Sequence, residues 1–142
     1  MNNSFKVCMP ISVNVGVRKK KTEYLNLNKY RNNHGHVNNT IKKLYKKIAE
    51  KKLSKVLKAN TFYEYYELKY ELFLPNKMHR DISNVLSIVD KSFNDAIVEF
   101  GIVEDDYYKY LQNVYYCYGG YDEEGEGYVE ITVTEVDNNK EV

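Results

Sequence analysis

The sequence predicts an α/β (α+β) fold in which a small mixed sheet carries two main helices packed on it. Two kinds of apolar spacing support this prediction. Apolar and polar residues alternate over 66–74 and 129–133, as in half-buried strands, whereas over 36–57 and 84–100 the apolar residues recur every three or four positions, as in amphipathic helices. The length of 142 residues fits one domain, so we expect residues 1–142 to form a single unit.

The first element is a short strand. Phe5 to Met9 form an apolar run that Pro10 ends, which predicts a first strand. Residues 12–33 show no clear period and contain the basic run Arg18-Lys-Lys-Lys21 and an asparagine-rich run over 25–33. We therefore expect a long basic loop, and loops of this length are usually functional or disordered.

The next element is a lysine-rich helix over residues 36–57. Its apolar stripe is formed by Val37, Ile41, Leu44, Tyr45, Ile48, Leu53 and Val56. The remaining faces and the segment just after the helix carry eight lysines against one glutamate, Glu50, so salt bridges within the helix cannot neutralise them. These lysines are Lys42, Lys43, Lys46, Lys47, Lys51, Lys52, Lys55 and Lys58. A solvated helix face is the alternative, but contact with DNA or RNA is the interpretation that we favour.

The second half of the chain contains the other main elements. A strand over 66–74 precedes a helix that begins near Asp81 or Ser83 and ends at Gly101, a residue type common just after a helix. Two apolar runs, 114–118 and 129–133, flank a glycine-rich turn and predict a hairpin. Residues 137–142 should fray.

Charge divides the chain into two halves. Residues 1–60 hold 15 Lys and Arg against 2 acidic residues, whereas residues 61–142 hold 6 against 18. We therefore expect a basic part, the loop and helix of 10–58, that faces a polyanion, and an acidic part, 61–136, with room for a metal site.

Several classes of protein lose their usual support. The sequence has no glycine-rich phosphate loop, no Gly-x-Ser-x-Gly motif and no zinc-binding spacing. Two cysteines, Cys8 and Cys117, form no framework, which favours a reducing cytoplasm. There is no apolar leader at the N-terminus and no apolar run of about 18 residues, so we expect no membrane association.

Carboxylates at the ends of elements are the best candidates for chemistry. Asp81 lies where a strand gives way to a helix, and Asp105 and Asp106 follow the apolar pair 102–103. Hard cations such as Mg²⁺ prefer oxygen ligands, and element ends can hold such ligands rigidly while leaving room for a phosphate. The alternative is structural, with Asp81 as a helix N-cap and Asp105–Asp106 as a solvated turn.

An ordered set of motifs is similar to the RusA-like Holliday junction resolvases and their phage-encoded relatives. The set consists of Arg80-Asp-Ile-Ser-Asn84, Val89-Asp-Lys-Ser-Phe-Asn-Asp-Ala96 and Gly101-Ile-Val-Glu-Asp-Asp106. It resembles the family pattern of Asp-x-Asp-Asn, a helical lysine, Asp-Ala, and Gly followed by Asp-Asp. The opening strand with Pro10 and the closing run 128–135 also resemble those of the family, so the resemblance spans most of the chain.

The resemblance implies a homodimeric, RusA-like, Mg²⁺-dependent endonuclease that makes paired cuts in four-way DNA junctions in the cytoplasm of a bacterial or phage-infected cell. Asp81, Asp105 and Asp106 are then the implied metal ligands, and whether Mn²⁺ replaces Mg²⁺ stays open. Two positions depart from the pattern, since Ser83 replaces the second aspartate and Ser87 the expected lysine. Lys91, one helical turn further on, keeps the spacing to Asp95, and Asp90 is a candidate for the missing carboxylate.

We therefore expect an endonuclease whose catalytic residues are Asp81, Asp90, Lys91 and Asp106. Expected DNA contacts are Arg18, Lys19, Lys20, Lys21, Lys29, Arg31, Lys42, Lys43, Lys46, Lys47, Arg80 and Asn84. One alternative is a protein that binds junctions without cutting them, and another is a structural protein whose charged halves pair in a homo-oligomer. A helix over 84–100 would be about 24 Å long and would separate Asp81 from Asp106. The site is therefore expected at or near a two-fold interface, where a partner subunit could supply a carboxylate.

Overall fold

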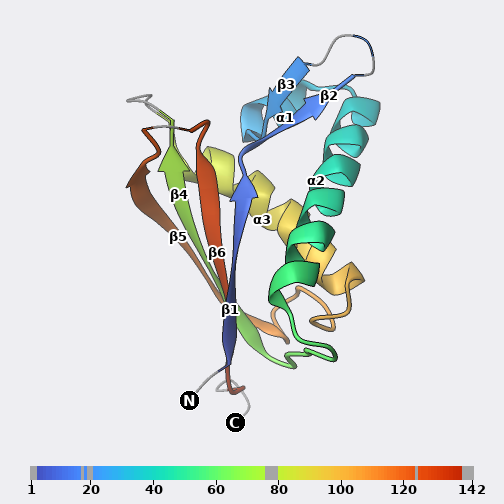
Figure 1. Cartoon of the computed structure of the whole chain (residues 1–142), viewed down its shortest axis with the longest axis vertical. Helices are drawn as coiled ribbons and strands as arrows, with labels where there is room; N and C mark the ends of the chain where they lie inside the picture. The colour runs from blue at the N-terminus through green and yellow to red at the C-terminus, as the bar shows by residue number, and fades with distance from the viewer. Residues whose placement is uncertain (1–2, 17, 19–20, 76–79, 124, 139–142) are drawn as a thin grey trace.

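The computed structural model describes residues 3–16, 18, 21–75, 80–123 and 125–138. The protein is a small α+β protein in which two main helices pack on a mixed four-stranded sheet and a two-stranded sheet (Figure 1). The elements are β1 (Ser4–Pro10), β2 (Ser12–Val15), β3 (Lys21–Tyr24), α1 (Leu27–Asn32), α2 (Gly35–Val56), β4 (Tyr66–Leu74), α3 (Ile82–Glu99), β5 (Leu111–Tyr121) and β6 (Tyr128–Glu135). The expected mixed sheet with two main helices is thus confirmed.

The strand order of the larger sheet is β1-β6-β4-β5. β6 pairs antiparallel with both β1 and β4, whereas β4 and β5 run parallel and are joined through α3. The predicted hairpin of 114–118 with 129–133 is wrong, because β4 lies between these two strands. The parallel pair needs a long crossover connection, which α3 supplies, and this crossover places β5 at the edge of the sheet.

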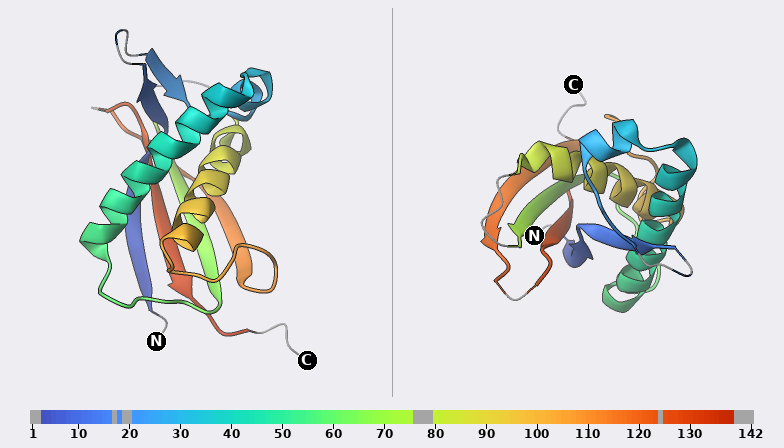
Figure 2. Two further views of the ribbon diagram at one scale, coloured as in Figure 1. Left: turned by 90° about the vertical axis from the view of Figure 1, so that its right-hand side faces the viewer. Right: turned by 90° about the horizontal axis from the view of Figure 1, so that it is seen from above.

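Both main helices cover the same face of this sheet (Figure 2). The core between them contains every second residue of β4, from Tyr66 to Leu74, together with the apolar side of α3. At the outer edge of the sheet Tyr45 of α2 is fully buried, and its hydroxyl donates to the carbonyl oxygen of Pro10 at 3.1 Å. The predicted helices and the strands at 5–9 and 66–74 are confirmed, as is Gly101 after α3, where φ is +84°.

The long loop predicted over 12–33 is wrong. This segment forms the β2–β3 sheet and the short helix α1, whose N-terminus is capped by the side chain of Asn26. Val13 and Leu25 are buried, and Glu23, also buried, forms an ion pair with Lys21 at 3.2 Å. Each element is too short for its apolar spacing to be recognised, and each is stabilised by packing on the core. Of the tail expected to fray, residues 139–142 lie outside the described residues.

Among the described residues, no helix is both long and apolar enough to cross a membrane.

Candidate nucleic-acid interface

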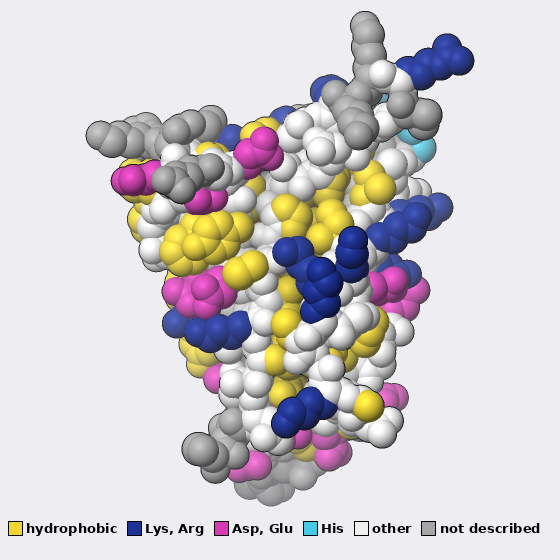
Figure 3. Space-filling view, in the orientation of Figure 1, with side chains coloured by type: hydrophobic (Ala, Val, Ile, Leu, Met, Phe, Trp, Pro, Cys, Tyr) yellow, Lys and Arg dark blue, Asp and Glu magenta, His cyan; other side chains and the backbone are white. Residues whose placement is uncertain are grey.

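A line of lysines follows the solvent side of α2. Lys43, Lys47, Lys51 and Lys55 are four residues apart and all exposed, so they form one stripe along the helix, the α2 stripe. Figure 3 shows lysine and arginine side chains over the region of α2. In the described part of the chain, none of the four forms an ion pair, whereas Lys46, on another side of the helix, pairs with Glu99 of α3. The α2 stripe therefore presents four exposed ammonium groups that pair directly with no carboxylate among the described residues.

A second group of cations surrounds two tyrosines beside α1. Lys42 and Lys91 lie over the Tyr30 ring, with their Nζ atoms 5.6 and 5.1 Å from its centroid. Lys29 and Arg80 lie over the Tyr24 ring, with the Lys29 Nζ atom 5.7 Å and the Arg80 Cζ atom 4.9 Å from its centroid. We call these four cations and two rings the tyrosine–cation cluster. Its members come from β3, α1, α2, α3 and the residue just before α3's N-cap, so tertiary structure alone brings them together.

The electrostatics of Tyr30 reflect this arrangement. Hydrogen bonding of the phenol oxygen with Lys42 and Lys91 lowers the pKa of Tyr30, since both ammonium groups favour the phenolate. The charges of two lysines from different helices therefore act on one phenol. No carboxylate in the described residues forms an ion pair with either lysine.

The other predicted DNA contacts are distributed around these two groups. Arg31 is exposed in the last turn of α1, and Arg18 is exposed near the end of β2. Lys21 is partly neutralised by Glu23. Lys19 and Lys20 lie outside the described residues.

Asp81 is at the N-cap position of α3, but its side chain makes no capping hydrogen bond. The exposed carboxylate instead accepts a hydrogen bond from the Asn84 side chain at 3.3 Å. The simple capping role therefore does not account for this aspartate. Asn84 and Lys91 share the outer side of α3, because seven residues bring a helix almost back to the same direction.

Asp90 points to another side of α3, toward the sheet. Its Oδ1 accepts from the Tyr70 hydroxyl at 2.7 Å and from the Asn94 amide at 2.6 Å, and its Oδ2 accepts from the Tyr116 hydroxyl at 2.8 Å. Burial raises the pKa of Asp90, against the opposing effect of these three donors. Its oxygens are thus occupied by protein donors, which indicates a structural role.

Asp105 and Asp106 lie in the turn before β5, near the C-terminal part of α3. The Tyr66 hydroxyl connects the two regions, at 2.9 Å from the Asn94 Oδ1 that accepts its hydrogen and 3.4 Å from the Asp105 carbonyl oxygen. Desolvation raises the pKa of Asp106, and the neighbouring Asp105 carboxyl raises it further. The neighbouring Asp105 carboxyl thus favours the protonated form of Asp106.

The predicted metal ligands do not converge within one chain. Asp81 precedes α3, whereas the Asp105 carbonyl oxygen contacts the Tyr66 hydroxyl, which donates to Asn94 of α3. Asn94 is 13 residues after Asp81, which separates the two by about 20 Å along the helix axis at 1.5 Å per residue. In the described residues no three His, Cys, Asp or Glu side chains are grouped so that they could hold a metal ion. The carboxylates of a single chain therefore do not fit a Mg²⁺ site formed by Asp81, Asp105 and Asp106, nor does Asp90 join either group.

The two positions that depart from the resolvase pattern are one helical turn apart on α3 and differ in exposure. Ser83 is exposed in the first turn of α3. The Ser87 hydroxyl is buried and has no hydrogen-bond partner in the described part of the chain. Neither serine restores the chemistry of the aspartate or lysine that the pattern expects.

Sequence reasoning missed the tyrosines that organise these groups. Tyr24 and Tyr30 fall in the segment expected to be a loop, and Tyr70 and Tyr116 were counted only as strand residues. The composition, with fifteen tyrosines and no tryptophan, was the available signal for such groups. A tyrosine offers a ring face that attracts cations and a hydroxyl that donates a hydrogen bond.

No known protein-family model matches the sequence, and no curated protein matches it. The resemblance to the RusA-like resolvases thus stays a prediction from the motifs.

Proposed function

We propose that this protein binds DNA through the basic surface formed by the α2 stripe and the neighbouring residues of α1. The observation that carries the proposal is the exposure of four lysines on one helical stripe without a carboxylate partner in the described residues. Such a surface gains affinity by releasing counterions from the phosphate backbone and does not depend on base sequence. A cytoplasmic location, as the sequence predicts, suits this function.

Four-way junction DNA is the substrate that the motif resemblance favours. Arms that diverge from a junction offer phosphates in several directions, and the basic residues of α1 and α2 lie on adjoining elements. Within this proposal the fold is a RusA-like one and the protein acts as a homodimer.

Metal-dependent cleavage of the junction is the second candidate function. Two observations favour cleavage. The Asp81 carboxylate is exposed and makes no capping hydrogen bond, and Asn84 and Lys91 lie on the same side of α3. Because the carboxylates of one chain do not converge, cleavage requires ligands from two subunits. Binding without cleavage requires no such arrangement.

The test of the proposal compares two triple variants by fluorescence anisotropy with a labelled four-way junction and a duplex. Lys43→Gln, Lys47→Gln and Lys51→Gln remove three charges from the α2 stripe. The control, Lys6→Gln, Lys69→Gln and Lys109→Gln, removes three charges elsewhere, two of which are paired with Glu130 and Glu71. Incubation of the same junction with and without Mg²⁺, followed on a gel, tests cleavage.

About six phosphate contacts would give a slope of log K against log salt near −5 for the wild type. We expect the α2 variant to reduce the steepness by about 0.9 for each lysine that contacts a phosphate, and the control variant to leave it unchanged. Equal effects of the two variants, or a wild type whose affinity does not depend on salt, would contradict the proposal.

A further inference from the structure

Four cations converge on two neutral rings in the tyrosine–cation cluster. A carboxylate that positions a lysine also cancels its charge, whereas a tyrosine ring positions the cation and leaves the charge in place. Lys29, Lys42 and Lys91 form no ion pair with a carboxylate in the described residues. The rings therefore position the three lysines while no described carboxylate pairs with them.

The two halves of the cluster border the same crevice. Tyr24, Lys29, Tyr30 and Lys42 line it, together with the side chains of Asn26, Asn33 and Asn38 and the apolar residues beneath them. Its volume of about 10 Å³ has room for no more than one water molecule. A ligand would consequently rest across the mouth of the crevice, against Lys29 and Lys42, and not enter it.

Charge of the same sign gathered in this way favours an anion over any neutral ligand. The acidic residues Asp95 and Glu99 of α3 line a neighbouring groove together with Lys42, Lys43 and Lys46, and Glu99 forms its ion pair there with Lys46. The cluster has three ammonium groups, which bind phosphate as point charges, and one guanidinium, which matches two oxygens of a phosphate at once. A phosphate group is the common anion that suits this set of donors.

We propose that the tyrosine–cation cluster is a discrete phosphate-binding subsite, in which Tyr24 and Tyr30 hold Lys29, Arg80, Lys42 and Lys91 ready for one phosphate group. The inference rests on the proposed DNA binding in taking a backbone phosphate as the ligand. The subsite fixes one point of the DNA, while the α2 stripe contributes affinity along the adjoining backbone. Tyr24 and Tyr30 act here as positioning residues.

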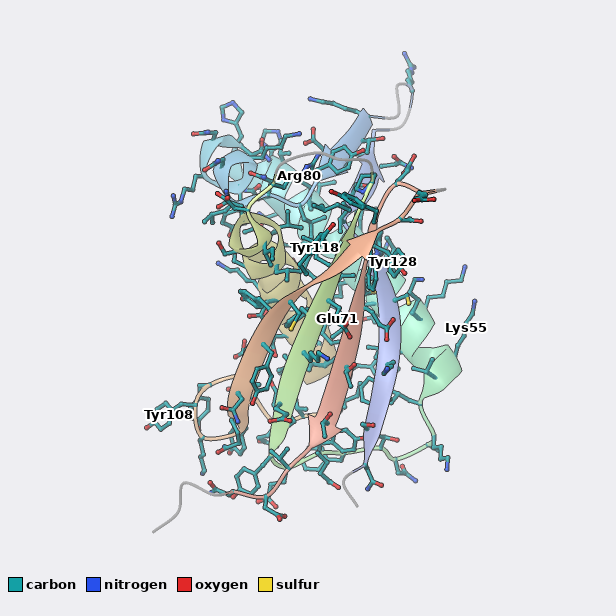
Figure 4. The ribbon with its side chains drawn as sticks, turned by 90° about the vertical axis from the view of Figure 1, so that its left-hand side faces the viewer. Lys55, Glu71, Arg80, Tyr108, Tyr118 and Tyr128 are labelled. Atoms are coloured by element: carbon teal, nitrogen blue, oxygen red, sulfur yellow. The ribbon has the colours of Figure 1, made fainter. Side chains whose placement is uncertain are left out.

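The first test changes the ring and keeps the charge. Tyr30→Leu removes both the ring and the hydroxyl beside Lys42 and Lys91, whereas Tyr30→Phe keeps the ring and removes only the hydroxyl. Tyr108→Leu is the matched control, because Tyr108 is exposed at the opposite end of the molecule from Arg80 (Figure 4). We expect duplex DNA affinity to fall about fivefold in Tyr30→Leu, by a smaller factor in Tyr30→Phe, which keeps the ring, and less than twofold in the control.

The second test removes charge at the subsite. The double variant Lys42→Gln and Lys91→Gln should reduce the steepness of the salt dependence for duplex DNA by about 0.9 in total, because the subsite contacts one phosphate. In addition, the melting temperature is compared in potassium phosphate and in potassium chloride of equal ionic strength, for the wild type and this variant. Inorganic phosphate should stabilise the wild type more than the variant, since a ligand of the folded state stabilises it.

The results separate the subsite from the proposed function. If Tyr30→Leu binds DNA as the wild type does while the α2 variant binds weakly, DNA binding stands and the subsite is overturned. If the wild type binds no DNA but is stabilised by inorganic phosphate through Lys42 and Lys91, the phosphate subsite stands for a free phosphate ligand and the proposed function is overturned. If neither DNA nor phosphate discriminates among the variants, both proposals fail.

Discussion

Substitution of Asp90 by alanine or asparagine distinguishes a structural carboxylate from a catalytic one. In Asp90→Ala the hydroxyl of Tyr70, which is fully buried, loses its acceptor. Tyr116 is 38% exposed and can donate to water instead. Asn94 keeps two hydrogen bonds, since it accepts from Tyr66 and donates to the Asp90 carbonyl oxygen at 3.2 Å.

The cost of Asp90→Ala follows from this count of donors. One buried donor without a partner destabilises a protein by about 1–3 kcal/mol, and the other two donors add little. Asp90→Asn retains an oxygen for Tyr70 and Asn94, and its amide can donate to Tyr116, whose hydroxyl also accepts. Because no charge is desolvated in this variant, its free energy of unfolding should lie within about 0.5 kcal/mol of the wild type or above it.

Urea titration followed by circular dichroism at pH 7 measures both differences. The reasoning is refuted if Asp90→Asn loses as much stability as Asp90→Ala, because the negative charge itself would then be required. Cleavage of a four-way junction by the wild type that is abolished in a stable Asp90→Asn protein would restore the catalytic role expected from the sequence.

Three other predictions follow from the structure. Burial raises the pKa of Asp90 above 3.8, so the folded state binds this proton more tightly than the unfolded state does. The free energy of unfolding of the wild type should therefore fall as pH rises from about 4 through the raised pKa, by about 1.4 kcal/mol per unit of the shift. The same dependence of stability on pH in Asp90→Asn would contradict this prediction. Gly127→Ala should lose about 2–4 kcal/mol in urea titration, because φ is +89° and a Cβ would lie 2.6 Å from the Pro75 ring and 2.9 Å from the Phe73 carbonyl oxygen, whereas Gly35→Ala, with nothing within 4 Å, should not destabilise. If the wild type cuts junctions, a mixture of Asp81→Asn and Asp106→Asn subunits should regain nicking activity that neither variant has alone, since a mixed dimer can hold one intact site; inactive mixtures would exclude ligands shared between subunits.

Local patterns in the sequence determined the main elements. In α2, β4 and α3 the apolar spacing persists over nine or more residues, and the position of Gly101 marks the end of α3. Such patterns report which side of an element is buried, and they do so without reference to any neighbour. The concentration of positive charge before residue 60 was equally visible, because it needs only a count.

Tertiary structure alone decided which elements and side chains meet. The order β1-β6-β4-β5 depends on the crossover through α3 and separates the two strands that sequence reasoning had paired. Asp90 and Lys91 are neighbours in sequence, yet the 100° between successive helical residues sends one to Tyr70 and Tyr116 of the sheet and the other to Tyr30 of α1.

The candidate site shows the same division. Its lysines and aspartates were identified in advance as residue types, but the grouping of Lys42 and Lys91 around Tyr30 joins segments 12 and 61 residues away along the chain. The length of α3 separates Asp81 from Asp105. The spacing of the motifs along the sequence does not report this separation in space. A periodic pattern encodes burial of one face, whereas contacts between distant segments depend on the simultaneous packing of all faces in one core.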